Sequence, residues 1–160
     1  MKIYIYVITI LLFHFPDIIE AQQVDSLKPG VPGSLYLEVA TILLAGNVSI
    51  NYEIPLKNHT LLRIGFGTGY FSEWEHESTT SFGLLAMVNF LTSGSDYRFE
   101  YGIGGSINRN KGETTKWKAF PAFDIGYRYQ SYSGGIVFRI GLGYVFSFGF
   151  PIYSSVGFAL

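Results

Sequence analysis

The run Leu62-Arg63-Ile64-Gly65-Phe66-Gly67-Thr68-Gly69-Tyr70 alternates large, mostly apolar residues with arginine and glycine. Successive side chains of a β-strand point to opposite faces, so the run predicts a strand with one apolar face and one face of arginine and glycine. A soluble β-protein buries its apolar face and exposes its charges to water. Here the charge shares its face with glycine, which favours the reverse arrangement: apolar outside and polar inside, as in a barrel surrounded by lipid.

The same pattern recurs eight times from residue 34 to residue 160. The predicted segments are Ser34–Thr41, Val48–Leu56, Leu61–Phe71, Ser81–Leu91, Tyr97–Ile107, Ala119–Tyr129, Ile136–Phe146 and Pro151–Leu160. Transmembrane strands need about 9–11 residues, which matches the length of these segments. The sequence therefore predicts an all-β fold, an eight-stranded antiparallel up-and-down transmembrane β-barrel whose polar lumen is filled by side chains. An even number of strands closes such a sheet and leaves no open edge.

The breaks between the segments differ in length and composition. Residues 57–60, 92–96 and 130–135 are short and rich in Gly, Ser, Asn and Asp, as tight turns require. Residues 72–80 and 108–118 are longer and charged. If the barrel begins on the periplasmic side, the tight turns lie in the periplasm and the longer loops outside the cell, as in outer-membrane barrels.

The composition also favours a membrane protein. Of the 160 residues, 14% are charged and 48% are hydrophobic, whereas about 25% charged residues are usual in soluble proteins. There is no cysteine, so disulfides and thiolate metal sites are excluded. The 11 basic and 12 acidic residues nearly balance, and no basic stripe indicates nucleic acid as a partner.

The first residues read as a secretory signal. Lys2 is followed by the apolar stretch Ile3–Phe15, then by Pro16 and by Ala21 as a small residue for cleavage. An uncleaved anchor helix is the alternative, but the stretch is short of the ~20 residues needed to span a bilayer. We therefore expect residues 1–21 to be a cleaved signal peptide, residues 22–33 a periplasmic N-terminal segment, and residues 34–160 the barrel.

The segments supply four acidic residues and four arginines to the predicted inner face. They are Glu38, Glu53, Arg63, Arg98, Glu100, Asp124, Arg128 and Arg139. A charge facing lipid at mid-depth costs about 2–4 kcal/mol, so the register that turns all eight inward is favoured. Equal numbers of each sign predict a salt-bridge network that blocks the lumen and holds the barrel together. The glycines at 65, 67, 69, 102, 104, 126, 141 and 143 are expected to make room for these long side chains. A gated narrow path through the lumen is the alternative.

Aromatic residues cluster where the segments should meet the membrane interfaces, which predicts two aromatic girdles. Toward the longer loops these residues are Tyr70, Trp74, Trp117 and Phe146, and toward the tight turns they are Tyr97, Tyr127, Tyr129 and Phe158.

Several runs resemble a known class of proteins. They are Ser49-Ile50-Asn51-Tyr52-Glu53, Leu62-Arg63-Ile64-Gly65-Phe66-Gly67, Ile125-Gly126-Tyr127-Arg128-Tyr129-Gln130 and Phe138-Arg139-Ile140-Gly141. With them the chain resembles small outer-membrane β-barrel proteins of Bacteroidetes type and, more broadly, OmpA-type eight-stranded transmembrane barrels. The resemblance implies the fold and an outer-membrane location, and it brings no known activity. The chain ends in Leu160 after Phe158, whereas such proteins often end in an aromatic residue.

No catalytic site, cofactor site or metal site is predicted. Small barrels that modify lipids use a His beside a Ser and an acid, and here only His76, with Ser72 or Ser78, lies in a suitable loop. The sequence therefore predicts an integral protein of the cell outer membrane, exported through the periplasm, with a structural or surface-interaction role. A lipid-modifying enzyme and a narrow gated transporter or pore are the alternatives. The expected partners are outer-membrane lipids, lipopolysaccharide and the barrel-assembly machinery, with no nucleic acid and an unspecified extracellular ligand.

Overall fold

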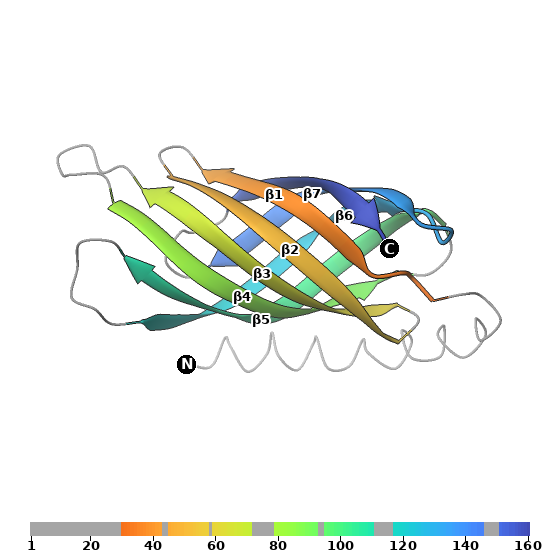
Figure 1. Cartoon of the computed structure of the whole chain (residues 1–160), viewed down its shortest axis with the longest axis horizontal. Coiled ribbons are helices and arrows are strands. Elements are labelled where there is room, and N and C mark those ends of the chain that lie inside the picture. Colours follow the sequence, from red (N-terminus) through yellow and green to blue (C-terminus); the bar gives the residue numbers. More distant parts are fainter. Residues whose placement is uncertain are drawn as a thin grey trace, which may run out of the picture.

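The computed structural model describes residues 30–42, 45–57, 59–71, 79–92, 95–110, 117–145 and 151–160. In this part of the chain eight β-strands form one closed antiparallel barrel, in which each strand pairs with its neighbours in sequence and β1 pairs with β8 (Figure 1). The strands are β1 (Ser34–Ile42), β2 (Ala45–Lys57), β3 (Thr60–Phe71), β4 (Thr79–Leu91), β5 (Tyr97–Asn110), β6 (Lys118–Gln130), β7 (Gly135–Val145) and β8 (Ile152–Ala159). The predicted fold class is confirmed, and each predicted segment corresponds to one strand.

The two ends of the barrel differ. At one end, here called the turn end, lie the short connections β2–β3, β4–β5 and β6–β7, together with the start of β1 and the end of β8 (Figure 1). The β6–β7 connection contains Gly134 and Gly135, whose φ angles of 86° and 103° strongly favour glycine. The opposite end, here called the loop end, carries the remaining connections. The predicted leader, residues 1–21, lies outside the described residues.

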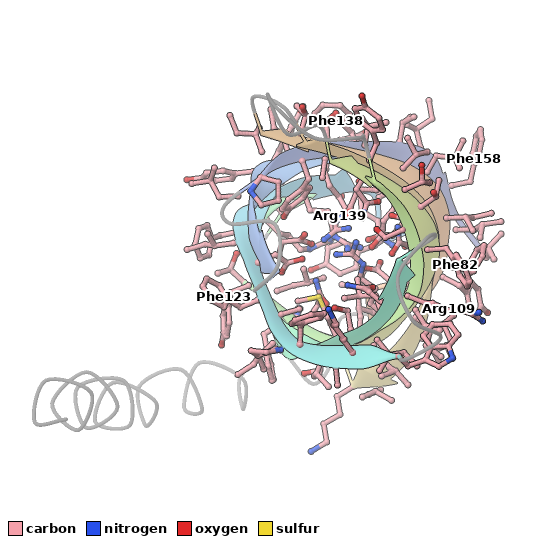
Figure 2. All side chains as sticks on the ribbon, turned by 90° about the vertical axis from the view of Figure 1, so that its left-hand side faces the viewer. Phe82, Arg109, Phe123, Phe138, Arg139 and Phe158 are labelled. Atoms are coloured by element: carbon pink, nitrogen blue, oxygen red, sulfur yellow. The ribbon has the colours of Figure 1, made fainter. Side chains whose placement is uncertain are left out.

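The outer wall is predominantly apolar. Side chains alternate between exposed and buried along the strands, as on β6 and β8, and the exposed ones include Leu37, Ile50 and Phe66 at about half their full accessibility. Figure 2, which looks along the barrel from the loop end, shows phenylalanines outside the wall and Arg139 near the centre. Among the described residues, no helix is long and apolar enough to cross a membrane.

Strand β5 is longer than the sequence predicted, and its extension adds one charge to the outer wall. The predicted segment ended at Ile107, but β5 continues to Asn110 because it stays paired with β4 up to that residue. Arg109 lies opposite Phe82 in this pairing and on the same outer face as Ile107 (Figure 2). This outward charge stands at the loop end, where lipid headgroups rather than hydrocarbon would surround it.

The turn end of the lumen is closed by a small apolar cluster. Val31, just before β1, is buried against Leu61 and Leu91, and Tyr132 packs on the same cluster. The Gln130 side-chain amide donates a hydrogen bond of 2.7 Å to the carbonyl oxygen of Pro32. The last part of the predicted N-terminal segment therefore seals this end of the barrel rather than extending away from it.

Candidate functional site

The inner face of the barrel carries all eight charged residues that the sequence placed there. Each is less than 10% exposed. They come from six strands and share the inward parity of their strands. Figure 2 shows one of them, Arg139, near the barrel axis. Seven of the eight form one connected set of ion pairs, here called the lumen network: Glu38, Glu53, Arg63, Glu100, Asp124, Arg128 and Arg139.

Arg128 on β6 binds two carboxylates from different strands. Its Nη1 and Nη2 donate to the two oxygens of Glu53 at 2.7 and 2.5 Å, a bidentate pair across the lumen to β2. Its Nε donates to Oε2 of Glu100 at 2.7 Å, and Nη1 also donates to the side-chain oxygen of Gln130. Charge-assisted and bidentate bonds are the strongest kind available to side chains, so Arg128 ties β2, β5 and β6 together.

Arg139 on β7 lies at the centre of the network. Its Nε and Nη2 donate to Oε1 of Glu100, and its Nη1 donates to the hydroxyl of Tyr36 and, at 3.1 Å, to Glu38. The guanidinium carbon lies 4.7 Å from the ring centre of Tyr36 and 5.2 Å from that of Tyr153. With Asp124, whose Oδ2 lies 3.4 Å from Nη2, two ring faces and three carboxylates therefore surround this buried cation.

Arg63 on β3 completes the network on the side of the loop end. It donates to Glu38 Oε1 at 2.5 Å, to Asp124 Oδ2 at 2.9 Å and to the side-chain oxygen of Asn51 at 2.9 Å. Asp124 Oδ2 also lies 3.4 Å from Nη2 of Arg139. Arg63 thus bridges β1, β2 and β6.

Arg98 does not join the network. Its Nη1 donates to the backbone oxygen of Gln130 at 2.8 Å, and its guanidinium carbon lies 4.1 Å from the ring centre of Tyr132 at the turn end. Within the described part of the chain it forms no ion pair, so the predicted pairing of four acids with four arginines is wrong at this position. The physical reason is register: Arg98 lies opposite Arg128, which already holds Glu100 and Glu53.

Gly126 and Gly141 face the backbone of the neighbouring strand and the side chain of Tyr153 rather than the arginines that the glycines were expected to accommodate. A Cβ on Gly126 or Gly141 would lie 2.5 or 2.7 Å from the hydroxyl of Tyr153, and a Cβ on Gly157 would meet Tyr36. Arginine side chains extend toward the barrel axis, whereas Tyr153 lies along the wall across β7 and β6. The glycines therefore make room for wall-lying side chains, and the aromatic ring then supports Arg139 from the side.

Sequence reasoning missed several uncharged members of the site. Tyr153 donates to Glu100 at 3.1 Å, Ser34 and Tyr36 donate to Glu53 at 2.5 and 3.0 Å, and Gln130 accepts from Arg128. The period of two along β1, β6 and β8 gives these positions the inward parity, so the signal was present. These residues were not recognised as members of the site because tyrosine and glutamine are also common on protein surfaces.

A cavity of about 100 Å³ occupies the lumen between the network and the loop end. Its lower boundary is formed by Glu38, Arg63, Asp124 and Tyr153, and residues from all eight strands line its wall. The wall residues are mostly small or apolar and include Gly67, Gly83, Leu85, Met87 and Ala122. The lumen is therefore divided along its axis into an apolar seal, a charged layer and an open upper chamber.

The chemistry that this arrangement offers is ionic and steric. No group of three or more His, Asp or Glu residues that could hold a metal ion occurs among the described residues. His59 is buried in the β2–β3 turn, on the opposite side of the barrel from the loop end, and His76 with its neighbouring serines lies outside the described residues. No catalytic constellation can therefore be built from the described residues.

The predicted girdle residues that the structure describes lie on the outer wall near the two ends. Tyr70 and Trp117, both 49% exposed, lie toward the loop end. Tyr97 and Tyr129 contact each other at the turn end with ring centres 5.0 Å apart, and Tyr127 packs near them against Phe99. Phe158 is 64% exposed at the same end on β8. Trp74 and Phe146 lie outside the described residues.

Comparison with solved structures identifies barrels of the same kind. The outer membrane protein Ail of Yersinia pestis, solved in a phospholipid bilayer nanodisc, matches with a TM-score of 0.57 and 10% identity over 81% of this chain and 99% of Ail. The N-terminal β-barrel domain of Pseudomonas aeruginosa OprF matches with a TM-score of 0.51 and 13% identity over 83% of this chain and 98% of that domain. At these identities the likeness concerns the fold. The sequence matches no protein-family model, and no curated protein is detectably similar to it.

Proposed function

We propose that this chain is an integral protein of the bacterial outer membrane whose barrel is a closed, rigid anchor that presents the loop end to the cell exterior. Its role is structural or interactive, without catalysis. The observation that carries the proposal is the distribution of polarity across the barrel wall, since charges fill the centre while large apolar side chains cover the outside.

The outer wall needs a nonpolar surrounding. Monomeric soluble proteins rarely expose contiguous apolar patches larger than a few hundred Å². Here exposed apolar residues run around the whole ring, from Leu37 on β1 through Phe66, Ile103 and Ile125 to Val156 on β8. Lipid hydrocarbon satisfies such a surface on all sides, and a closed barrel leaves no unpaired backbone in that hydrocarbon.

The lumen supports an anchor rather than a channel. Arg128 and Arg139 are fully or almost fully buried, and both bind the buried carboxylate of Glu100 inside the lumen. The apolar cluster of Val31, Leu61 and Leu91 closes the turn end below them. An ion crossing the barrel would have to break several buried ion pairs, each of which is costly to disrupt.

The proposal includes the route to the membrane and the partners met on it. Residues 1–21 act as a signal peptide, the chain crosses the periplasm, and the barrel-assembly machinery inserts it. Once inserted, the wall contacts outer-membrane lipids and lipopolysaccharide, and the aromatic girdles lie at the two interfaces.

Two experiments test the proposal. Cell fractionation should place the protein in the outer membrane, and unheated samples should migrate differently from heated ones on a denaturing gel. Purified protein reconstituted in planar bilayers should show no steady single-channel openings. Recovery in the soluble fraction would overturn the location, and steady openings would overturn the closed lumen.

For the enzyme alternative, membranes from cells with and without the gene should have the same acyl pattern.

A further inference from the structure

One charged side chain lies on the outer wall at the loop end of the barrel. Arg109, near the end of β5, is half-buried, and Figure 2 shows it outside the wall on the same side as Phe82. Apart from Lys57 at the turn end, it is the only charged residue on the outer face of the described strands. It forms no ion pair within the described part of the chain. A guanidinium on a lipid-facing wall needs water or an anion, because hydrocarbon cannot solvate its charge.

Aromatic side chains lie on both sides of Arg109. Phe82 on β4 is opposite Arg109 in the strand pairing. Trp117 directly precedes β6, in which Lys118 pairs with Asn108, so Trp117 follows on from that pairing next to Arg109. The Phe82 and Trp117 rings contact each other across β5, with ring centres 5.6 Å apart and planes at 89°. Arginine and tryptophan are side chains that place a polar group among lipid headgroups and an apolar part next to the acyl chains.

The outer wall below Arg109, toward the turn end, is uncharged and includes a shallow area. The outward positions of the next two rows, each about 7 Å from the last, carry apolar side chains or glycine: Leu84, Ile107 and Ala119, then Ala86, Gly105 and Pro121. Apart from its neighbours in the chain, only the backbone oxygen of Phe120 lies within 4 Å of the place that a Cβ on Gly105 would take. No side chain of another strand therefore covers Gly105, and an acyl chain has room to lie along β5 below Arg109.

We propose that Arg109 binds a phosphate group of lipid A in the outer leaflet, while an acyl chain of the same lipid packs along β5 over Gly105. The inference rests on the proposed function, since only an outer-membrane barrel with its loop end outside meets lipopolysaccharide at this position. Charge complementarity carries it, because guanidinium binds phosphate through two parallel hydrogen bonds. A phosphate monoester, as in lipid A, carries about −1.5 to −2 charges at pH 7, whereas the phosphodiester of a phospholipid carries a single charge. Lipid A is therefore the stronger partner for Arg109.

The test uses the mature protein refolded in a nonionic detergent, with bound lipid counted by native mass spectrometry. One lipid A molecule should bind with high occupancy, and lipid A without its phosphates should bind about tenfold more weakly. Phosphatidylglycerol and inorganic phosphate at equal concentration should not displace lipid A. Equal binding of the dephosphorylated lipid would show that phosphate is not recognised. Displacement by phosphatidylglycerol or by inorganic phosphate would show a site for any anionic lipid or for free phosphate. Each of these results would overturn the proposal.

Matched variants locate the binding on the outer wall. Arg109→Gln removes the charge and should weaken lipid A binding about tenfold. Gly105→Leu occupies the open surface of β5 and should also weaken binding, while the preference for the phosphorylated lipid remains. Lys57→Gln removes the exposed cation at the turn end of β2 and should leave binding unchanged.

Heat-dependent gel mobility shows which variants are folded. If Arg109→Gln does not fold, the comparison of phosphorylated with dephosphorylated lipid A on the unaltered protein decides. Unchanged binding by folded Arg109→Gln contradicts the site but leaves the outer-membrane location intact. Recovery of the unaltered protein in the soluble fraction of cells overturns the proposed function instead, so the two failures are distinguishable.

Discussion

Replacing Arg128 with methionine should strongly destabilise the barrel. Arg128 holds Glu53 by two bonds at 2.5 and 2.7 Å and Glu100 by one at 2.7 Å, and all three side chains are fully buried. Methionine retains much of the apolar contact but leaves Glu53 as a buried carboxylate without a cation. Breaking a buried pair from one side costs about 3–5 kcal/mol. We expect the free energy of unfolding to fall by about that amount.

The double variant Arg128→Met, Glu53→Met should be less destabilised than the sum of the two single variants. Removing both partners removes both desolvation costs, and hydrophobic replacement of a whole buried pair is often neutral. Glu100 keeps Arg139 and Tyr153 as donors, so the remainder of the network persists. We expect a coupling energy of about 0.5–3 kcal/mol between the two positions.

The measurement is urea unfolding of the protein refolded in lipid bilayers, followed by tryptophan fluorescence and by gel mobility. Arg109→Met is the matched control, because it makes the same substitution on the outer wall at the loop end and should change stability by about 0.5 kcal/mol or less. If Arg128→Met costs no more than Arg109→Met, or if the two network substitutions are additive, the network does not hold the barrel as the geometry indicates.

Three further predictions use the same unfolding measurement. Arg98→Met should change stability by less than about 1 kcal/mol. Arg98 has no carboxylate partner among the described residues, so its removal leaves no buried carboxylate without a cation. A loss of stability as large as that of Arg128→Met would contradict this. Gly126→Ala should cost about 1–3 kcal/mol, since its Cβ would lie 2.5 Å from Tyr153 and from the oxygen of Ile140. Gly143→Ala is its control, with the nearest atom 3.7 Å away, and equal costs would argue against close packing as the cause. If lipid covers the wall, Ile140→Arg near mid-strand should cost about 2–4 kcal/mol of stability, and Phe158→Arg near the turn end about 0–1 kcal/mol. If water surrounds the wall, the two substitutions should show no such difference in cost.

The fold followed from the sequence because a barrel in lipid has one dominant rule. Each strand must show apolar residues outward and hide its charges, and a shift by one residue would expose every charge at once. Residues 61–71 and 97–107 obey this rule so strictly that their strands and faces were predictable. The end of β5 was not, because Arg109 breaks the alternation at a depth where the rule no longer applies.

The internal arrangement of the lumen was less predictable. Inward parity follows from a period of two, but the partner of each charge depends on stagger between strands that are distant in sequence. Arg63 meets Asp124, and Arg128 meets Glu53, across the barrel. Arg98 has the same local pattern as Arg128 yet lies beside Tyr132 instead. Asn89 and Asp124, on either side of Gly102, likewise become neighbours only once three strands are aligned.

The seam between β1 and β8 has a consequence for how the ring is made. It joins the first strand to the last, from Ser34 with Ala159 to Thr41 with Ile152, and Leu160 donates its backbone N–H to Gly33. Before β8 pairs with β1, the sheet is open, and its two edge strands have unpaired backbone N–H and C=O groups. Lipid hydrocarbon cannot form hydrogen bonds with these groups. Membrane insertion and closure of the barrel must therefore occur together, or a strand of another protein must pair with the open edges until the last strands are in place.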